Sequence, residues 1–301
     1  MLTSAVESYL AVRRAAGYQL AVHQYLLGAF ARCAANHGEA HVRSTTAIAW
    51  AAQAPSAYQR NWRLQVVIGF ARHVHAEDAA HEIPPGHVFA VPWQRRRPHL
   101  FSPAALRQLL EAAGRLGPPG SLRPHAYGTL LGLLAACGLR ISEALGLCVD
   151  DVTPDGLVIR QTKFHKSRLV PMHETTARAV HAYLERRRQR AGASSQIFVS
   201  LGGRPMRYPE VNRVFLALVR GLGLRGAPGA DGPRLHDLRH TFAVRVLEEC
   251  PRDDVARHML ALSTYLGHTQ LADTYWYLHV TPHLLTGIAD TCQAYLHGDT
   301  P

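Results

Sequence analysis

Lysine is almost absent from this 301-residue chain: all but two of its 33 basic side chains are arginine. The two lysines, Lys163 and Lys166, stand three positions apart. Arginine does not release its proton in a protein, whereas burial or like charge can lower the pKa of a lysine. Two interpretations stay open for this pair, a lysine that donates a proton in catalysis and a solvated turn that holds two lysines by chance.

Other features are also missing. No apolar run approaches the roughly 18 to 20 residues that a helix needs to cross a bilayer, and the first residues lack the basic and apolar blocks of a secretion signal. No Cys-x-x-Cys pair occurs among the five widely spread cysteines. We therefore expect a cytoplasmic protein with reduced thiols, without membrane contact, a disulfide framework or a zinc cluster. The cysteines are Cys33, Cys137, Cys148, Cys250 and Cys292.

Acidic side chains are too few to balance the arginines. The formal net charge is +11 and the sequence pI is about 9.9, with 19 histidines uncounted. This balance favours a polyanion as partner and says nothing of the fold. A hydrophobic content of 47% is typical of a globular protein, and the length allows one large domain or two ordinary ones.

The chain divides by pattern into two parts. Apolar stripes at helical spacing predict a helical domain over residues 1–91. Prolines around three arginines in residues 92–98 favour an exposed basic linker, placed at 92–102. A capping serine at Ser102 followed by Pro103 predicts the start of a helix and of a second domain, 103–301. The stripes are Val6, Tyr9 and Leu10; Leu26, Phe30 and Cys33; and Leu64, Val67, Ile68 and Ala71.

The second part has a mixed pattern. A long apolar helix is expected over 124–137, ending near Gly138, with a short helix over 139–145. Two short strands, 157–161 and 168–171, would be joined by the turn that holds both lysines. Helices are expected to dominate the rest, apart from a loop at 223–233. The predicted fold is mainly α with a small β-sheet.

His236, Arg239 and His240 share one face of a predicted helix by their three-and-four spacing. His236 and His240 have the spacing of a zinc-binding helix, but Asp237 stands where a zinc hydrolase needs glutamate, and no third ligand has a local signature. A second interpretation is that His236 and Arg239 converge on an anion, the histidine handling a proton and the arginine the charge. A third is ordinary packing of a histidine against the next element.

Two tyrosines, Tyr275 and Tyr277, follow the box Leu266-Gly267-His268. Such aromatic residues are most often part of a core or an interface. A tyrosine can also attack a phosphate and form a covalent intermediate, provided that positive groups stabilise that phosphate.

Together these residues resemble the catalytic set of the tyrosine recombinases, the phage integrase family. Order and spacing agree at six positions, each in its own short box, and it is the combination that gives the resemblance. Family spacing selects Tyr277 rather than Tyr275 as the nucleophile. The resemblance in motifs covers about residues 100–281, and for the N-terminal part it rests on helical character and position alone. The six positions are Arg140, Lys163, His236, Arg239, His268 and Tyr277.

The resemblance implies a fold and a set of partners. It implies an N-terminal helical, SAM-like domain that clamps DNA and a mixed α/β catalytic domain of the integrase type. The substrate would be double-stranded DNA with a specific recombination site, cut and rejoined without metal or other cofactor. A homo-tetramer, or a hetero-tetramer with related recombinases, would assemble on the DNA. The helix expected after Thr281-Pro282 would pack on its own domain or dock on a neighbouring subunit.

The resemblance also implies a role for each residue. Tyr277 would attack the phosphodiester, giving a 3′-phosphotyrosyl bond and a free 5′-hydroxyl, while Arg140 and Arg239 would grip the non-bridging oxygens. Lys163 would protonate the leaving 5′-oxygen. His236 would accept or orient the tyrosine proton.

Roles are also expected for His268 and for two residues outside the set of six, Glu143 and Lys166. His268 would hydrogen-bond a phosphate oxygen. We expect Glu143 to hold an arginine or the packing of its helix, and Lys166 to contact a backbone phosphate or to be solvated.

Three rival functions stay open. A type IB topoisomerase uses a similar pocket, although the Leu-Gly-His box and the two-domain length favour a recombinase. A non-catalytic DNA-binding regulator would not need the intact six-residue set. The zinc hydrolase is the third.

Overall fold

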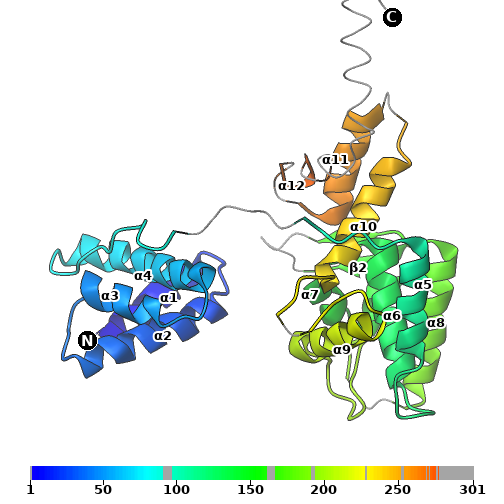
Figure 1. The fold of residues 1–301 in the computed structure, drawn as a ribbon, viewed down its shortest axis with the longest axis horizontal. Coiled ribbons are helices and arrows are strands. Elements are labelled where there is room, and N and C mark those ends of the chain that lie inside the picture. Colours follow the sequence, from blue (N-terminus) through cyan, green and yellow to red (C-terminus); the bar gives the residue numbers. More distant parts are fainter. Residues whose placement is uncertain are drawn as a thin grey trace, which may run out of the picture. The chain divides into compact units, whose positions relative to one another are not determined.

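The computed structural model divides into two compact units, Met1–Arg96 and Arg97–Pro301. Figure 1 shows the helices of each unit. Each unit has its own apolar core. The structure describes residues 2–90, 97–160, 167–190, 194–227, 229–251, 254–268, 270, 272–275 and 277.

The first unit is built from helices, as the apolar stripes predicted. Val6, Leu26 and Phe30 are all buried in one core with Leu64 and Val67. Cys33 lies at the edge of that core, partly exposed. The helices of this unit are α1 (Leu2–Ala15), α2 (Ala21–Asn36), α3 (Ser44–Ala52) and α4 (Ala57–Glu77).

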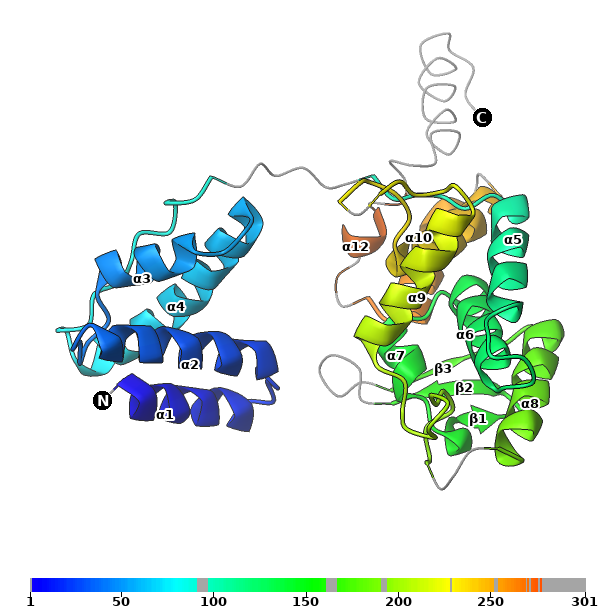
Figure 2. The ribbon, with the colours of Figure 1, turned by 60° about the horizontal axis from the view of Figure 1, so that its bottom comes forward.

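The second unit is mainly helical, with one small sheet (Figure 2). This agrees with the predicted fold class. Its helices are α5 (Pro103–Gly114), α6 (Arg123–Cys137), α7 (Ile141–Gly146), the 3-10 helix η1 (Val149–Asp151), α8 (Glu174–Arg188), α9 (Tyr208–Gly221), α10 (Leu235–Glu248), α11 (Val255–Leu266) and α12 (Ala272–Tyr275). Its strands are β1 (Val152–Thr153), β2 (Gly156–Ile159) and β3 (Arg168–Val170).

The sheet has the order β1-β2-β3, and both pairs are antiparallel. The two predicted strands are present as β2 and β3, while the two-residue strand β1 was not predicted. At Gly156 a Cβ would meet the carbonyl oxygen of Val170 at 2.4 Å, so only glycine allows β2 to start so close to β3. The predicted turn between the strands, with both lysines, lies outside the described residues.

Helix α6 is the centre of the second unit. It packs against α5, α8 and α10, and its buried side chains include Leu130, Leu131 and Leu134. A helix that is apolar on most of its surface belongs in a core. Because α6 is surrounded, the residue at which it ends is fixed relative to three other helices.

Two predicted helix boundaries are confirmed. The hydroxyl of Ser102 accepts a hydrogen bond from the backbone N–H of Ala105 at 3.1 Å, with Pro103 in the first turn of α5. Helix α6 ends at Gly138, whose φ of 58° is left-handed. The predicted loop at 223–233 contains neither helix nor strand where it is described.

Other predictions fall partly or wholly outside the described residues. Of the linker at 92–102, residues 92–96 are not described, so its exact bounds stay a prediction. The helix expected after Thr281 is also outside, as is Cys292. Among the helices that are described, none has the length and the apolarity that crossing a membrane requires.

Two glycines of α6 provide a test of this arrangement. A Cβ at Gly138 would meet Cδ1 of Phe242 at 2.4 Å, and a left-handed residue with a Cβ costs roughly 1 to 2 kcal/mol besides. Gly138→Ala should therefore destabilise the second unit. Gly128, inside α6, has nothing within 4 Å of its Cβ position, so Gly128→Ala should stabilise the same helix by about 0.5 to 1 kcal/mol.

Hydrogen–deuterium exchange of peptides from α6 and α10 measures both effects in the unit concerned. Faster exchange is expected for Gly138→Ala and slower exchange for Gly128→Ala. Equal protection in the two variants would contradict the packing of α10 on the end of α6.

Candidate active site

The turn between α6 and α7 positions the first candidate residue. Gly138 ends α6, and two residues later Arg140 is the N-cap of α7. The Nη2 of Arg140 donates to the carbonyl oxygen of Gly267 at 3.0 Å, and its Nη1 donates to Oε1 of Glu143 at 2.9 Å. The Arg140 side chain keeps 35% of its surface exposed. It is thus fixed at two points and still open to a ligand.

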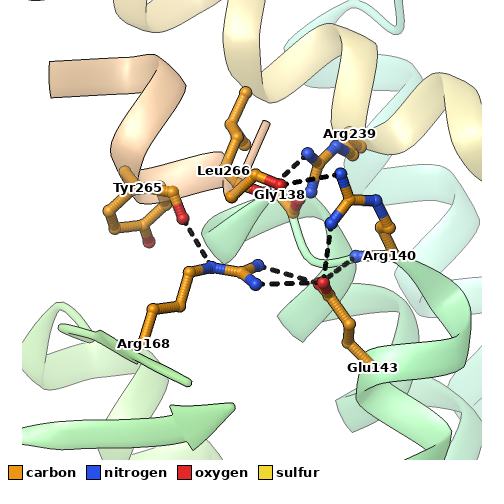
Figure 3. A network of polar contacts seen from close by, with 8 residues as sticks. Gly138, Arg140, Glu143, Arg168, Arg239, Tyr265 and Leu266 are labelled. Atoms are coloured by element: carbon orange, nitrogen blue, oxygen red, sulfur yellow. Dashed lines mark hydrogen bonds and ion pairs between the residues drawn. The ribbon is translucent and has the colours of Figure 1, made fainter. Parts of the chain in front are cut away.

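Glu143 lies between two arginines (Figure 3). Its carboxylate accepts hydrogen bonds from Arg140 and from both Nη atoms of Arg168, at 3.0 and 2.8 Å. Burial alone would raise the pKa of Glu143, but the hydrogen bonds of Arg168 and of the Arg140 backbone lower it to about 2. The prediction that Glu143 holds an arginine is confirmed, and the second arginine was not foreseen.

Arg239 is the most deeply buried cation of the site, with 1% of its surface exposed. Its Nη1 donates to the carbonyl oxygen of Gly138 at 2.7 Å and its Nη2 to that of Leu266 at 2.8 Å. These carbonyls lie at the C-terminal ends of α6 and α11, where the helix dipoles are negative and backbone acceptors lack helical partners. Burial, and then the charge of Arg140, lower the pKa of Arg239 to about 10, so it stays charged at neutral pH.

The histidines of α10 lie beside this arginine. The rings of His236 and His240 meet edge to face with centroids 4.5 Å apart. The side of the His236 ring that is covered by protein loses hydration, which lowers its pKa to about 4, and the charge of Arg239 adds to the effect. The residue as a whole is still exposed on one side. Burial lowers the pKa of His240 to about 3. Both rings are neutral at pH 7, when a nitrogen of His236 can accept a proton.

His268 directly follows Gly267, the left-handed C-cap of α11. Its Nδ1 is 2.7 Å from the hydroxyl of Thr274, which fixes the ring. Burial lowers the pKa of His268 to about 4, and the charges of Arg239 and Arg140 contribute. Its ring is stacked on Tyr277 with centroids 6.2 Å apart.

Tyr277 is 2% exposed and belongs to the apolar cluster between α10 and α11. Tyr277 also has a polar neighbour, because its ring contacts the ring of His240 with centroids 5.6 Å apart. Burial raises the pKa of the phenol, while the charge of Arg239 and a hydrogen bond from it act in the opposite direction. Tyr275 is 51% exposed.

The structure therefore brings five of the six sequence-predicted residues together, and Lys163 lies outside the described residues, as does Lys166. Strand β3, which follows the two lysines in the sequence, reaches the site through Arg168 at its first position. No local pattern in the sequence identifies Arg168 or Thr274 as part of the site. The five residues are Arg140, His236, Arg239, His268 and Tyr277.

One group in the first unit has metal-type side chains. Ligand atoms of His41, Asp78 and His81 lie within 4.8 Å of one another, and no other group of three meets this criterion in the described part of the chain. However, Nδ1 of His81 accepts the backbone N–H of Val42 at 3.0 Å, which leaves the proton of a neutral ring on Nε2. A nitrogen that holds a proton donates rather than ligates, so the group fits a hydrogen-bond network.

The lowered histidine pKa values predict a loss of stability in mild acid. Between pH 6.5 and about 4 the unfolded chain binds protons that folded His240 and His268 do not bind, so stability must fall as pH falls. Each histidine contributes a slope of up to about 1.4 kcal/mol per pH unit. The stability that the Glu143 carboxylate contributes is lost at lower pH, as the pH falls from 4.5 to about 2.

Urea unfolding at pH 7.5, 6.5, 5.5 and 5.0 measures this slope. His240→Gln should flatten the dependence between pH 6.5 and 5.0 relative to the parent chain. An unchanged slope would contradict the burial of a neutral ring at this position.

Comparison with known proteins points to a family whose match covers the residues of this site. The phage integrase family matches residues 101–283, a span that includes all six predicted positions. Protein y4rB of Sinorhizobium fredii is 40% identical over 293 residues, which cover 93% of this chain and 93% of that protein. Tyrosine recombinase XerC of Alcanivorax borkumensis is 29% identical over 226 residues, which cover 73% of this chain and 68% of that protein.

Solved structures show the same fold. The Tn1549 transposon integrase in complex with transposon right end DNA has a TM-score of 0.64 at 16% identity, over 92% of this chain and 94% of that one. The XerH site-specific recombinase bound to palindromic difH substrate has a TM-score of 0.63 at 16% identity, over 84% of this chain and 73% of that one. With the family match and the relatives, the chain belongs to the phage integrase family and is a tyrosine recombinase, an enzyme that cleaves and rejoins DNA.

Proposed function

We propose that this chain cleaves DNA at a specific site through a 3′-phosphotyrosyl bond to Tyr277 and rejoins it to a different 5′-hydroxyl. One observation supports this most strongly. Two guanidinium groups, Arg140 and Arg239, are held by backbone carbonyls next to the phenol of Tyr277. The bond energy of the broken phosphodiester stays in the tyrosyl linkage, so no cofactor is needed to rejoin the strand.

The arginines would stabilise charge on the phosphate. A planar guanidinium suits two phosphate oxygens, and donors fixed before the reaction need no rearrangement when charge gathers in the transition state. Arg239 has no carboxylate within 4 Å among the described residues, and its carbonyl partners carry only partial charge. Most of its positive charge is therefore available to a phosphate.

Neutral imidazoles would handle protons and hydrogen bonds. His236 is neutral at physiological pH and can accept the phenolic proton or orient it. If Nδ1 of His268 accepts the hydroxyl hydrogen of Thr274, the proton of the neutral ring is on Nε2, which can then donate to a phosphate oxygen. Arg239 lowers the pKa of the phenol against the effect of burial, which favours the phenolate in the transition state.

Burial of Tyr277 adds a condition. A phenol that is 2% exposed cannot reach a phosphate, so Tyr277 must become exposed before cleavage. Binding of DNA would supply the energy for that movement, because a polyanion can interact with the buried Arg239 only when the site is open. The unbound enzyme is then inactive.

The substrate is duplex DNA. A net charge of +11 supports binding to a polyanion, and the similar Tn1549 integrase and XerH were solved with DNA bound. On the first unit, Arg63 lies over the ring of Trp50 at 5.2 Å, and Tyr58 and Trp62 are exposed. We extend the proposal to a clamping role for this unit, assembly as a tetramer on DNA and a cytoplasmic location.

The choice of nucleophile can be tested with a nicked duplex that traps the covalent complex. Duplexes selected for binding from a random-sequence pool supply the site. The parent chain should give an adduct resistant to denaturant, and Tyr277→Phe should give none while its DNA affinity stays within about threefold. Tyr275→Phe is the matched control and should still form the adduct.

If Tyr275→Phe abolishes the adduct and Tyr277→Phe does not, the nucleophile is Tyr275. Relaxation of a plasmid without the selected site, at the rate seen with it, would favour a type IB topoisomerase activity instead of recombination.

The role of Lys163 can be tested through the leaving group. Lys163→Arg should slow cleavage by about 10² or more, because a guanidinium does not give up its proton. A duplex with a 5′-thio leaving group should restore the rate, since a thiolate departs without an acid. Lys166→Arg, three positions further along the chain, is the matched control, and it should cleave both duplexes at nearly the parent rate.

Failure of the 5′-thio duplex to restore the Lys163→Arg rate would contradict the role of proton donor. Single-turnover rates at saturating enzyme separate this effect from weaker DNA binding.

A further inference from the structure

We propose that Arg168 is a positioning residue that keeps the charge of Arg140 available to the scissile phosphate by taking up the carboxylate of Glu143. The inference rests on the proposed function, since it concerns the same phosphate site. Arg168 is the first residue of β3, and 12% of its side-chain surface is exposed. Because its guanidinium is paired with the carboxylate of Glu143, unlike that of Arg239, it would act on a DNA phosphate through its neighbours.

The contacts of Arg168 join three elements. Its two Nη atoms donate to the two oxygens of Glu143, on α7, in a bidentate arrangement. Its Nε donates to the carbonyl oxygen of Tyr265, on α11, at 2.8 Å. A Cβ at Gly267 would meet its Nη1 at 2.8 Å, so the guanidinium packs directly on the C-cap that precedes His268.

The side chain of Arg140 makes fewer hydrogen bonds to the Glu143 carboxylate than that of Arg168. Its side chain gives Glu143 one hydrogen bond, from Nη1 to Oε1, while Nη2 turns to the carbonyl of Gly267 (Figure 3). Oε1 of Glu143 accepts Nη1 of both arginines, and Oε2 accepts Nη2 of Arg168 and the backbone N–H of Arg140, so the Arg140 guanidinium forms no fork with this carboxylate. The side chain of Arg140 thereby keeps its exposed part for another anion.

The charges of Arg140, Glu143 and Arg168 also indicate that Arg168 keeps Arg140 available to a phosphate. Arg140, Arg168 and Glu143 together carry a net charge of one positive unit, apart from the charge of Arg239. Without Arg168, Glu143 would neutralise Arg140, and the attraction for a phosphate in a site of low dielectric would fall. If Glu143 were also made neutral, the net charge would again be one positive unit. This reversal distinguishes a charge-sharing role from loss of a structural contact.

Single-turnover cleavage of the selected nicked duplex at saturating enzyme tests the proposal. Arg168→Gln should cleave roughly 10- to 100-fold more slowly than the parent, with its DNA dissociation constant within about threefold. The double variant Arg168→Gln/Glu143→Gln should cleave faster than Arg168→Gln alone. A double variant as slow as the single one, or an Arg168→Gln rate equal to the parent rate, would overturn the proposal.

Two controls sharpen the test. Arg160→Gln removes the same charge eight residues earlier in the sequence, where Arg160 pairs with Asp151 and is 61% exposed. This variant should cleave within about threefold of the parent rate. The 5′-thio duplex should leave the ratio of parent to Arg168→Gln rates unchanged. Full restoration by the thio duplex would show that Arg168 acts through the leaving-group acid, which contradicts the proposal.

Thermal unfolding of each variant shows whether it is folded at the assay temperature. If Arg168→Gln is not, Arg168→Lys takes its place, because an ammonium holds one carboxylate oxygen without a fork. It should cleave more slowly than the parent and be accelerated by Glu143→Gln, and the absence of either effect would overturn the proposal. If the parent itself forms no adduct, the proposed function fails, and this inference with it.

Discussion

The site depends on one buried charge, the guanidinium of Arg239, and on the two carbonyl oxygens that hold it. A cation that is 1% exposed would be costly without partners. The partners here are the carbonyls of Gly138 and Leu266, at the C-terminal ends of two helices. Such carbonyls need donors in any case, so one contact satisfies both groups. Because carbonyls carry partial charge only, the cation is stabilised and not neutralised.

This arrangement explains how residues distant in the sequence meet. Gly138 and Gly267 each end a helix in a left-handed conformation, and each is followed within two residues by a candidate catalytic side chain, Arg140 or His268. Arg239 connects the two helix ends from a third helix, α10. The charges of Arg239 and Arg140 also lower the pKa of His236 and help keep it neutral. The arrangement that places the two arginines therefore also keeps His236 able to accept a proton. The phenol of Tyr277 is covered in this structure, and the proposed mechanism requires that it be uncovered before cleavage.

Much of the fold could be predicted because its signals are local. Ser102 with Pro103 marks a helix start, Gly138 marks a helix end, and the apolar stripes of the first unit mark its core. Strand β1 was missed, because two residues have no periodicity. The second partner of Glu143 was missed for another reason: Arg168 approaches it from a strand, and no spacing in the sequence reports that approach. Burial of Tyr277 against exposure of Tyr275 is likewise a result of packing.

A crystal structure of the chain with a nicked duplex and orthovanadate tests the central claim most directly. Vanadate takes up the five-coordinate geometry of the phosphorus in the transition state. We expect vanadium bonded to Oη of Tyr277, with the guanidinium groups of Arg140 and Arg239 on its equatorial oxygens and the carbonyl contacts of Arg239 retained. Vanadium bonded to Tyr275, or an Arg239 that has left both carbonyls, would contradict the account.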